Sequence, residues 1–242
     1  MKTSNLVKLT NLSNTSRMSG NSLESVRELR KKEGKEAYDL WMDKIEYIDT
    51  IYGLIDLIEK VDVKDKVIVE IGSFLGVSTE TFLLHEPKKM YAIDPWGLAG
   101  NSTGLAPPER EPNEADHFTE DHGGWDGVEQ KFRDRVKSYQ NIEIIKNFSV
   151  EAAKNFEEES LDFVYVDGNH EWEHVANDIT SWWPKIKVNG YMGGHDFYET
   201  KELCHAIGVE NTVYYYFAHE GHLNNHVEVF SDSSWLFKKI HK

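Results

Sequence analysis

Short apolar runs alternate with helical patterns along most of this 242-residue chain. The runs are rich in β-branched and aromatic residues, and they predict strands at Val67–Ile71, Met90–Ile93, Ile142–Ile145 and Leu161–Val166. Between and after them, apolar positions three and four residues apart predict helices at Val77–Leu84, Val128–Tyr139 and Ser149–Phe156. Regular alternation of strand and helix predicts an α/β fold with a mostly parallel sheet.

The first part of the chain has a different pattern. Residues 1–22 are rich in Ser, Thr and Asn without a sustained period, which predicts a mobile tail. Residues 23–60 are helical in pattern, and their apolar side chains form one stripe: Leu40, Trp41, Ile45, Ile48, Ile51, Ile55 and Ile58. We expect this stripe to pack on the domain or on another subunit of a homo-oligomer. Residues 61–242 are long enough for one compact α/β domain.

A long polar stretch interrupts the alternation after the second strand. Residues 96–126 are acidic, contain many Gly and Pro residues, and show little periodicity. Loops of this length inside a compact α/β domain are usually lids or disordered segments. Because the stretch leaves directly from a strand end, we interpret it as a substrate lid, with disorder as the alternative.

A glycine-punctuated turn follows the first predicted strand. It runs from Glu70 through Gly72 to Gly76, where Gly72 allows a tight turn and Gly76 a close approach of the next helix to the strand. The free N–H groups at that helix N-terminus would face a ligand. A dinucleotide fingerprint requires Gly-x-Gly-x-x-Gly, and Glu70 and Leu75 occupy two of its glycine positions. The pattern therefore argues against NAD.

The spacing Glu-x-Gly-x-x-x-Gly resembles the first motif of class I S-adenosylmethionine (SAM)-dependent methyltransferases. In that family the glycine turn passes under the amino-acid part of the cofactor. The resemblance implies S-adenosyl-L-methionine as the cofactor and assigns contacts with it to Glu70, Gly72, Ser73, Gly76 and Ser78.

Two further residues extend the predicted cofactor site. Asp94 ends the second apolar run, and an acid at that distance after the glycine turn is placed to bind a ribose diol. Asp before Pro95 is also common in ordinary turns. Ser149 follows the third strand, where related methyltransferases often contact adenine, and it fits a helix N-cap equally well. We predict both residues as cofactor contacts.

Charge and composition narrow the possible partners. The net charge of −15 and the pI near 5.2 argue against nucleic acid, because phosphate binding depends on Lys and Arg. The single cysteine, Cys204, cannot form an internal disulfide, and we see neither a signal-peptide pattern nor a membrane-spanning run. We expect a cytoplasmic protein without a membrane partner that acts on a small molecule.

Acids and imidazoles gather at two later strand ends. Asp167 and His170 follow one strand, and His195 and Asp196 end the next segment. The carboxyl ends of parallel strands line one crevice, so these four side chains should meet beside the cofactor. Converging carboxylates and imidazoles suggest a divalent metal. The alternative is a polar pocket in which the same groups only form hydrogen bonds.

From about residue 66 onward the chain resembles methyltransferases that include cephalosporin-hydroxylase-like proteins and metal-dependent macrolide-sugar O-methyltransferases. In the latter, an Asp-x-x-His after the fourth strand supplies a metal ligand and a general base, matched here by Asp167 and His170. An acidic pair after the fifth strand supplies further ligands, and Asp196 matches the second residue of that pair, with His195 at the first position. The resemblance also counts Asp167 among the cofactor contacts.

His195 departs from the pattern of that family, in which the two ligands after the fifth strand are usually Glu and Asp. Mg²⁺ prefers oxygen ligands, whereas Mn²⁺, Fe²⁺ or Zn²⁺ accept histidine; the predicted metal is Mg²⁺ or Mn²⁺. Residues 227–230 and 234–238 also resemble the antiparallel hairpin that closes the sheet in this fold. The predicted fold is a Rossmann-like, seven-stranded methyltransferase sheet, mostly parallel with a C-terminal antiparallel hairpin, preceded by N-terminal helices.

One motif supports a competing function. The sequence from His170 to His174 reads His-Glu-x-x-His, which on a helix would hold zinc with Glu171 as the base of a metalloprotease. Here the motif follows directly after a strand end, and we expect His174 to face outward or to pack on its helix. A methyltransferase-fold protein that only binds a ligand is a third alternative.

These observations predict a SAM-dependent O-methyltransferase that acts on a hydroxyl of a small molecule such as a sugar or glycosylated metabolite. The sugar rests on the family resemblance alone. In this scheme a metal on Asp167, His195 and Asp196 binds the acceptor hydroxyl and lowers its pKa. His170 takes the proton, and the methyl group moves in one in-line displacement.

Overall fold

The computed structural model describes residues 48–98, 119–120, 122–197, 208–219 and 227–240. Seven strands form one sheet in the order β3-β2-β1-β4-β5-β7-β6. The strands are β1 Val67–Ile71, β2 Lys89–Asp94, β3 Ile142–Lys146, β4 Leu161–Val166, β5 Ile186–Gly194, β6 Glu228–Val229 and β7 Trp235–Lys238. The first five strands pair in parallel, and β7 pairs antiparallel with both β5 and β6. This topology confirms the predicted seven-stranded methyltransferase sheet.

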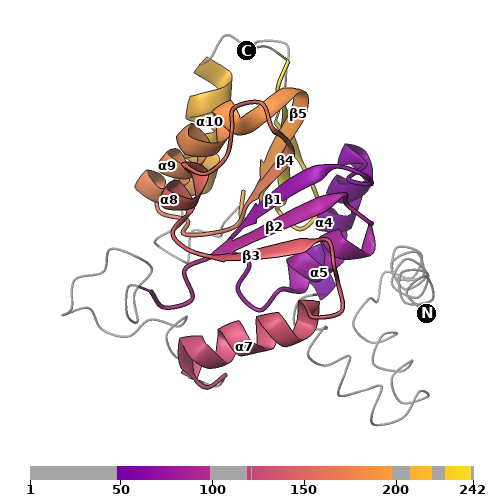
Figure 1. The fold of residues 1–242 in the computed structure, drawn as a ribbon. Coiled ribbons are helices and arrows are strands. Elements are labelled where there is room, and N and C mark those ends of the chain that lie inside the picture. The colour runs from indigo at the N-terminus through magenta and orange to yellow at the C-terminus, as the bar shows by residue number, and fades with distance from the viewer. Residues whose placement is uncertain (1–47, 99–118, 121, 198–207, 220–226, 241–242) are drawn as a thin grey trace, which may run out of the picture. The chain divides into compact units, whose positions relative to one another are not determined.

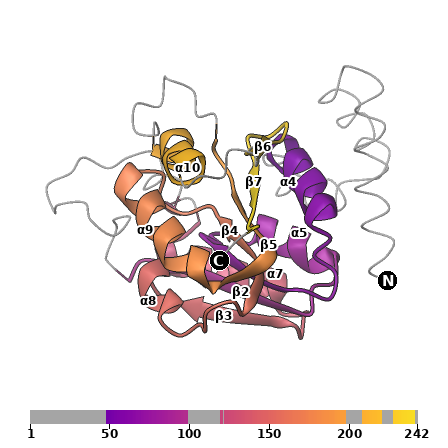
Figure 2. The same ribbon diagram turned by 90° about the horizontal axis from the view of Figure 1, so that it is seen from above.

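Helices cover both faces of the sheet, as the view from above shows (Figure 2). One face carries α8 Ser149–Ala153, α9 Trp172–Trp182 and α10 Gly208–His219. The other carries α4 Ile48–Val61, α5 Val77–Leu84 and α7 Gly124–Val136. Each face has its own apolar core, because strand side chains point alternately to the two sides. The domain is thus a sheet with two helical layers.

The strand register brings the ends of four parallel strands to one edge. Ile71 at the end of β1 pairs with Ile93 of β2 and with Val166 of β4. Val166 in turn pairs with Gly194 of β5. The residues that follow these positions therefore lie along the same edge, where β2, β1, β4 and β5 run side by side (Figure 1). This edge carries the candidate site.

Several predicted boundaries differ from the structure. Helix α7 begins at Gly124, four residues before the predicted start and inside the predicted loop, and α8 ends at Ala153 instead of Phe156. The hairpin forms as predicted but with a two-residue β6. Helix α10 was not predicted, because its polar and aromatic residues give little amphipathic contrast.

Part of the N-terminal and loop predictions falls outside the described residues. This applies to the tail at 1–22, to the helical segment before residue 48, to any oligomer contact through it, and to most of the proposed lid. Within α4, Ile55 and Ile58 are buried in the core, as the apolar stripe predicts. No helix in the described part of the chain is both long and apolar enough to cross a membrane.

Candidate active site

The turn after β1 is held by backbone contacts on both sides. Gly72 has a positive φ of 85° and donates its N–H to the carbonyl of Ile93 at 2.9 Å. On the other side, a Cβ at position 72 would lie 1.9 Å from the carbonyl oxygen of Asp167. Both the conformation and the space therefore require glycine here. The predicted tight turn is confirmed, and its close neighbour is the end of β4.

The second glycine of the motif allows a different approach from the one predicted. Gly76 adopts a left-handed conformation with a φ of 80° and caps the N-terminus of α5. A Cβ there would lie 2.8 Å from the ring of Phe132 on α7. Gly76 therefore makes room for α7, and the predicted close approach of α5 to its strand is not the reason for this glycine.

Glu70 lies behind the turn in the core. Its side chain is fully buried, and the Thr79 hydroxyl of α5 donates a hydrogen bond to its carboxylate. Burial raises the pKa of Glu70 to about 7, although hydrogen bonds from Ser78 and Thr79 oppose the rise. Glu70 thus links β1 to the first turns of α5, and it does not line the cavity described below.

Asp94 fixes the turn from the side of β2. Its two carboxylate oxygens accept the backbone N–H groups of Phe74 at 2.9 Å and of Trp96 at 2.8 Å. Burial raises the pKa of Asp94 to about 6, against the lowering effect of these two hydrogen bonds. The residue predicted to bind ribose therefore also holds the glycine turn against the second strand.

A cavity of about 410 Å³ opens at this edge of the sheet. Four of the predicted cofactor contacts line it: Gly72, Asp94, Ser149 and Asp167. Four others, Glu70, Ser73, Gly76 and Ser78, are not among its lining residues and remain predictions. The walls come from β1, β2, α7, α8 and α9 and from the segments that follow β1, β2, β3 and β4, so the cavity spans most of the carboxyl edge.

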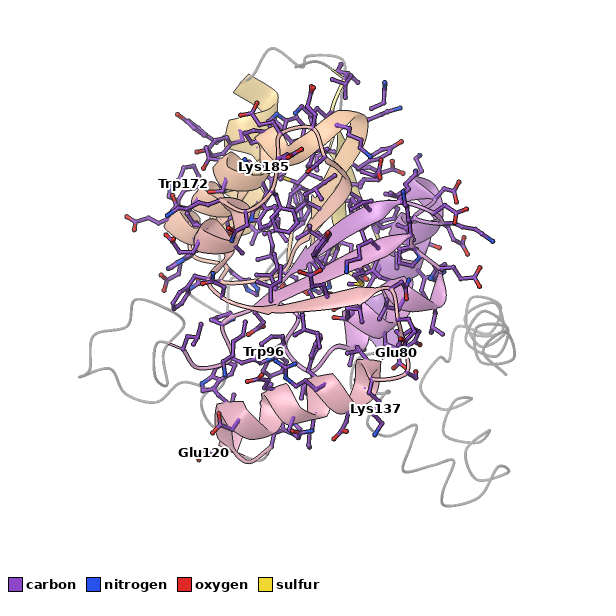
Figure 3. All side chains as sticks on the ribbon, viewed as in Figure 1. Glu80, Trp96, Glu120, Lys137, Trp172 and Lys185 are labelled. Atoms are coloured by element: carbon purple, nitrogen blue, oxygen red, sulfur yellow. The ribbon has the colours of Figure 1, made fainter. Side chains whose placement is uncertain are left out.

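Aromatic side chains form the wall on the α7 side. The rings of Phe74 and Trp125 meet edge to face at a centroid distance of 6.1 Å, and both line the cavity. Beneath them, Trp96 donates its indole N–H to the carbonyl of Phe74 at 3.0 Å and packs on Phe132 at 4.8 Å. Figure 3 shows Trp96 between the sheet and α7. This packing holds Phe74 at a positive φ of 43°, which is unusual for an aromatic residue.

Ser149 has a different role from the helix cap that was the alternative prediction. Phe148 occupies the N-cap position of α8, and no side chain caps that helix. The Ser149 hydroxyl accepts the indole N–H of Trp182 at 2.9 Å and forms a hydrogen bond with the carboxyl group of Asp178. Ser149 thereby joins α8 to α9 at the wall of the cavity.

Sequence reasoning missed several lining residues on α8 and α9. They are Asn147, Phe148, Val150, His174, Asn177 and Asp178. Asp178 carried a usable signal, because it interrupts an apolar helical stripe formed by Val175, Ile179 and Trp182. An acid at a core position of an amphipathic helix is rare unless it has a partner or a function.

Three of the four predicted strand-end groups come together beside the cavity. Asp167, His170 and Asp196 each offer a ligand atom, and these atoms all lie within 4.8 Å of one another. The Nε2 atom of His170 lies 3.1 Å from Oδ2 of Asp196. We call these three residues the acidic triad. Two carboxylates and one imidazole form a suitable donor set for a divalent cation.

The fourth predicted group, His195, also contacts Asp196. Its Nδ1 atom lies 3.1 Å from Oδ2 of Asp196, so it contacts the triad through this carboxylate. Its Nε2 atom is buried and has no hydrogen-bond partner among the described residues. The three ligand atoms that lie within 4.8 Å of one another belong to Asp167, His170 and Asp196, and metal binding by His195 stays a prediction. His195 is placed to orient Asp196 from behind.

Burial and neighbouring charges shift the pKa values of Asp167, Asp196 and His195. Burial, followed by the nearby charge of Asp196, raises the pKa of Asp167 to about 6. Burial also acts to raise the pKa of Asp196, but the hydrogen bond from His195 and the charges of both histidines lower it overall. Although burial opposes its charged form, His195 has its pKa raised to about 9 by Asp196 and Asp167. A cation would relieve the repulsion between the two carboxylates.

The structure does not support the zinc-protease interpretation of His-Glu-x-x-His. Helix α9 begins at Trp172 with Glu171 at its N-cap, so His170 precedes the helix. The two histidines are therefore not on successive turns of one helix, as that motif requires. His170 joins the acidic triad, whereas His174 lines the cavity. The Nε2 atom of His174 also lies 3.9 Å from the carboxylate of Glu171, so this side chain both packs at the start of its helix and lines the cavity.

Sequence comparison identifies the class of protein. Residues 69–197, more than half of the chain, match the profile of a family described as a methyltransferase domain. The chain belongs to this family and is a SAM-dependent methyltransferase. No relative among curated proteins matches significantly.

Solved structures with the same fold share little sequence with this chain. The O-methyltransferase NovP is 13% identical, with a TM-score of 0.54 over 80% of this chain and 81% of its own. A Streptococcus mutans protein in complex with S-adenosylhomocysteine is 13% identical, with a TM-score of 0.51 over 78% and 97%. A Geobacter sulfurreducens methyltransferase is 12% identical, with a TM-score of 0.52 over 86% and 90%. These similarities support the fold.

Proposed function

We propose that this methyltransferase transfers the methyl group to a hydroxyl of a small molecule with the help of a divalent cation. The observation that carries the proposal is the position of the acidic triad, with Asp167 belonging both to the triad and to the wall of the cavity. A cofactor in the cavity would have its reactive end beside groups that can activate a hydroxyl. Methyl transfer to oxygen needs such groups, because an alcohol is a weak nucleophile.

The residues of the triad divide into two roles. We assign the cation to the carboxylates of Asp167 and Asp196, with His195 hydrogen-bonded to Asp196 to fix its orientation. When bound there, a divalent cation would act as a Lewis acid that lowers the pKa of the acceptor hydroxyl. His170 accepts the proton, since its imidazole lies beside the same carboxylate.

The rest of the site holds the reactants in line. Gly72 and Asp94 position the cofactor by its amino-acid and ribose parts, and the aromatic wall of Phe74 and Trp125 excludes water from the cavity. One displacement then breaks the carbon–sulfur bond of the sulfonium and forms the new carbon–oxygen bond. Correct placement of the two reactants supplies most of the acceleration in such a step.

We propose a small, uncharged acceptor, with a sugar or glycosylated metabolite as the leading class. The net charge of −15 disfavours polyanions such as nucleic acids. Structural similarity to the O-methyltransferase NovP is compatible with an oxygen acceptor. The sugar itself comes from the resemblance of Asp167-x-x-His170 and Asp196 to the motifs of macrolide-sugar methyltransferases.

Transfer assays with and without a chelator test this proposal. We expect the protein to bind S-adenosylhomocysteine in calorimetry and to methylate members of a panel of sugar-bearing alcohols. Chelation should abolish transfer, and Mg²⁺ or Mn²⁺ should restore it. Asp196→Asn should lose both transfer and metal binding, while Asp126→Asn, an exposed carboxylate on α7, should retain both. Full activity of Asp196→Asn in chelator would contradict the role of the metal.

A further inference from the structure

Asp178 is a buried acid in the wall of the cavity that none of the roles above uses. Only 5% of the residue is exposed, and it lies on the inward face of α9 among Val175, Ile179 and Trp182. Burying a carboxyl group among apolar side chains is costly unless a partner compensates for it. The position therefore calls for a ligand or a structural partner.

Among the described residues, the side-chain partner of this carboxyl is the hydroxyl of Ser149. That hydroxyl accepts the indole N–H of Trp182 at 2.9 Å, which leaves its own proton for Asp178. This chain of hydrogen bonds fixes the orientation of the carboxyl group. Because a carboxyl group has up to four acceptor positions, one bond from Ser149 leaves it able to accept another from a molecule in the cavity.

The order of groups along the sheet edge indicates which part of the cofactor lies there. The acidic triad follows β4 and β5, Asp94 ends β2, and Ser149 follows β3. With the sulfonium toward the triad and the ribose at Asp94, the base extends to the end where α8 meets α9. Phe148 and Val150 provide apolar surface at that end.

We infer that Asp178 recognises the adenine of the cofactor by accepting a hydrogen bond from its exocyclic amino group. The inference rests on SAM occupying this cavity. Adenine presents the amino group as a donor on its outer edge, whereas a 6-oxo purine presents an acceptor there. A carboxylate held in place therefore selects adenine and repels hypoxanthine.

A second polar group of the same helix points to a ligand at this end. His174 lies one turn before Asp178, also lines the cavity, and has a buried Nε2 atom without a hydrogen-bond partner among the described residues. Buried polar atoms of this kind are usually satisfied in the functional state. The adenine base of the cofactor carries ring nitrogens that can form a hydrogen bond with this Nε2 atom.

Calorimetry with two ligands tests the inference. The ligands are S-adenosylhomocysteine and its analogue in which hydrogen replaces the 6-amino group of the base. At pH 8, where the carboxyl group is ionised, we expect the wild-type protein to bind the analogue roughly ten- to a hundredfold more weakly, as for loss of a hydrogen bond to a charged group. Asp178→Ala should bind both ligands equally, at the affinity of the wild type for the analogue. Glu173→Gln, an exposed acid on the same helix, should behave as the wild type.

Asp178→Asn provides a variant that keeps the side-chain shape and the bond to Ser149. An amide can accept from adenine or donate to a 6-oxo group, so this variant should bind S-inosylhomocysteine at least tenfold more tightly than the wild type does. Thermal unfolding of each variant verifies that the fold is intact.

The outcomes separate this inference from the function on which it rests. If the wild type binds S-adenosylhomocysteine but Asp178→Ala weakens both ligands by the same factor, Asp178 contacts another part of the cofactor and the inference is wrong. If Asp178→Ala weakens the affinity for both ligands equally but leaves the affinity for 5′-methylthioadenosine unchanged, the carboxyl group contacts the methionine ammonium. Absence of any S-adenosylhomocysteine binding by the folded wild type would overturn the cofactor assignment itself.

Discussion

Gly72 and Asp167 are in backbone contact at the centre of the site, where a Cβ on Gly72 would lie 1.9 Å from the carbonyl oxygen of Asp167. Gly72 begins the turn after β1, and Asp167 follows β4. The Asp167 N–H also donates to the carbonyl of Ile71 at 2.8 Å. The main chain therefore sets the distance between the cofactor turn and the proposed metal ligand.

Gly72→Ala should weaken S-adenosylhomocysteine binding and lower the stability of the protein. The methyl group would collide with a backbone carbonyl, and the φ of 85° adds strain of roughly 1–3 kcal/mol for a residue other than glycine. We expect the turn to move and the affinity measured by calorimetry to fall by at least tenfold. Thermal unfolding would report the accompanying loss of stability.

Gly124→Ala is the matched control for Gly72→Ala. Gly124 has a similar positive φ of 73°, but a Cβ there would have no neighbour within 4 Å. Gly124→Ala therefore has a backbone strain similar to that of Gly72→Ala, but its methyl group meets no neighbouring atom. If both variants lost affinity equally, the contact between Gly72 and Asp167 would have no special role in binding.

Stability of the ligand-free protein should fall as pH rises through the pKa of Glu70, which burial raises to about 7. Below its ordinary value of 4.5 the carboxyl is protonated in both states. Between these values the unfolded chain releases the proton and the folded protein retains it, so the folded state loses stability as pH increases. The loss is complete above pH 7 and amounts to at most about 3 kcal/mol.

Glu70→Gln should reduce this pH dependence, because the amide does not titrate. Asp94 and Asp178, whose pKa values burial raises to about 6 and about 7, should maintain part of it. Urea unfolding at pH 5 and at pH 8 measures the difference, with exposed Glu173→Gln as the control. Parallel pH profiles for wild type and Glu70→Gln would mean that Glu70 does not cause the dependence.

The sequence predicts the sheet well because its strands are local signals. Apolar runs such as Leu161–Val166 have the length and composition of buried strands, and the structure begins and ends β4 at the same residues. The antiparallel C-terminal hairpin was predicted from the family resemblance, and β7 pairs antiparallel with both β5 and β6. The start of α7 was missed, because Gly123 and Gly124 look like loop residues but here adopt positive φ values where the helix begins.

The site was predicted less completely because its residues meet through tertiary contacts. Strand ends place Gly72, Asp94 and Asp167 at one edge, and sequence reasoning can follow that rule. It predicts that both His170 and His195 meet the carboxylates, and both lie 3.1 Å from Asp196, but it cannot determine which of the two imidazoles comes close to Asp167 and Asp196 together. The pair Ser149 and Asp178 was invisible for the same reason, because it joins two helices far apart in sequence.

His174→Ala should raise the KM for SAM by roughly two- to tenfold and leave the metal content unchanged. The imidazole lines the cavity but lies outside the acidic triad, so its loss removes a cofactor contact of ordinary hydrogen-bond strength. Initial rates and metal analysis measure the two effects, with exposed Glu173→Ala as the control. Loss of stoichiometric zinc together with peptide hydrolysis by the wild type would instead support the metalloprotease motif.

His170→Ala and His195→Ala should differ in what they remove. As the proposed base, His170 should contribute roughly 10²–10⁴-fold to kcat, while its loss should spare the affinity for S-adenosylhomocysteine. His195 contacts Asp196 through Nδ1 at 3.1 Å, so its loss should weaken metal binding by roughly 10–100-fold through the disordered carboxylate. Calorimetry with Mn²⁺ and single-turnover transfer rates separate the two results.

His195→Glu introduces the carboxylate that the resemblance to metal-dependent macrolide-sugar methyltransferases implies at this position. Because His195 lies behind Asp196 and outside the acidic triad, we expect the preference between Mg²⁺ and Mn²⁺ to stay the same. A shift toward Mg²⁺ would place the side chain on the ion, as the sequence first predicted.

Loss of metal in His170→Ala would likewise make His170 a ligand, and proton removal would then fall to solvent. Retention of metal with slow transfer in His170→Ala is the result that the proposed role of His170 as the base predicts.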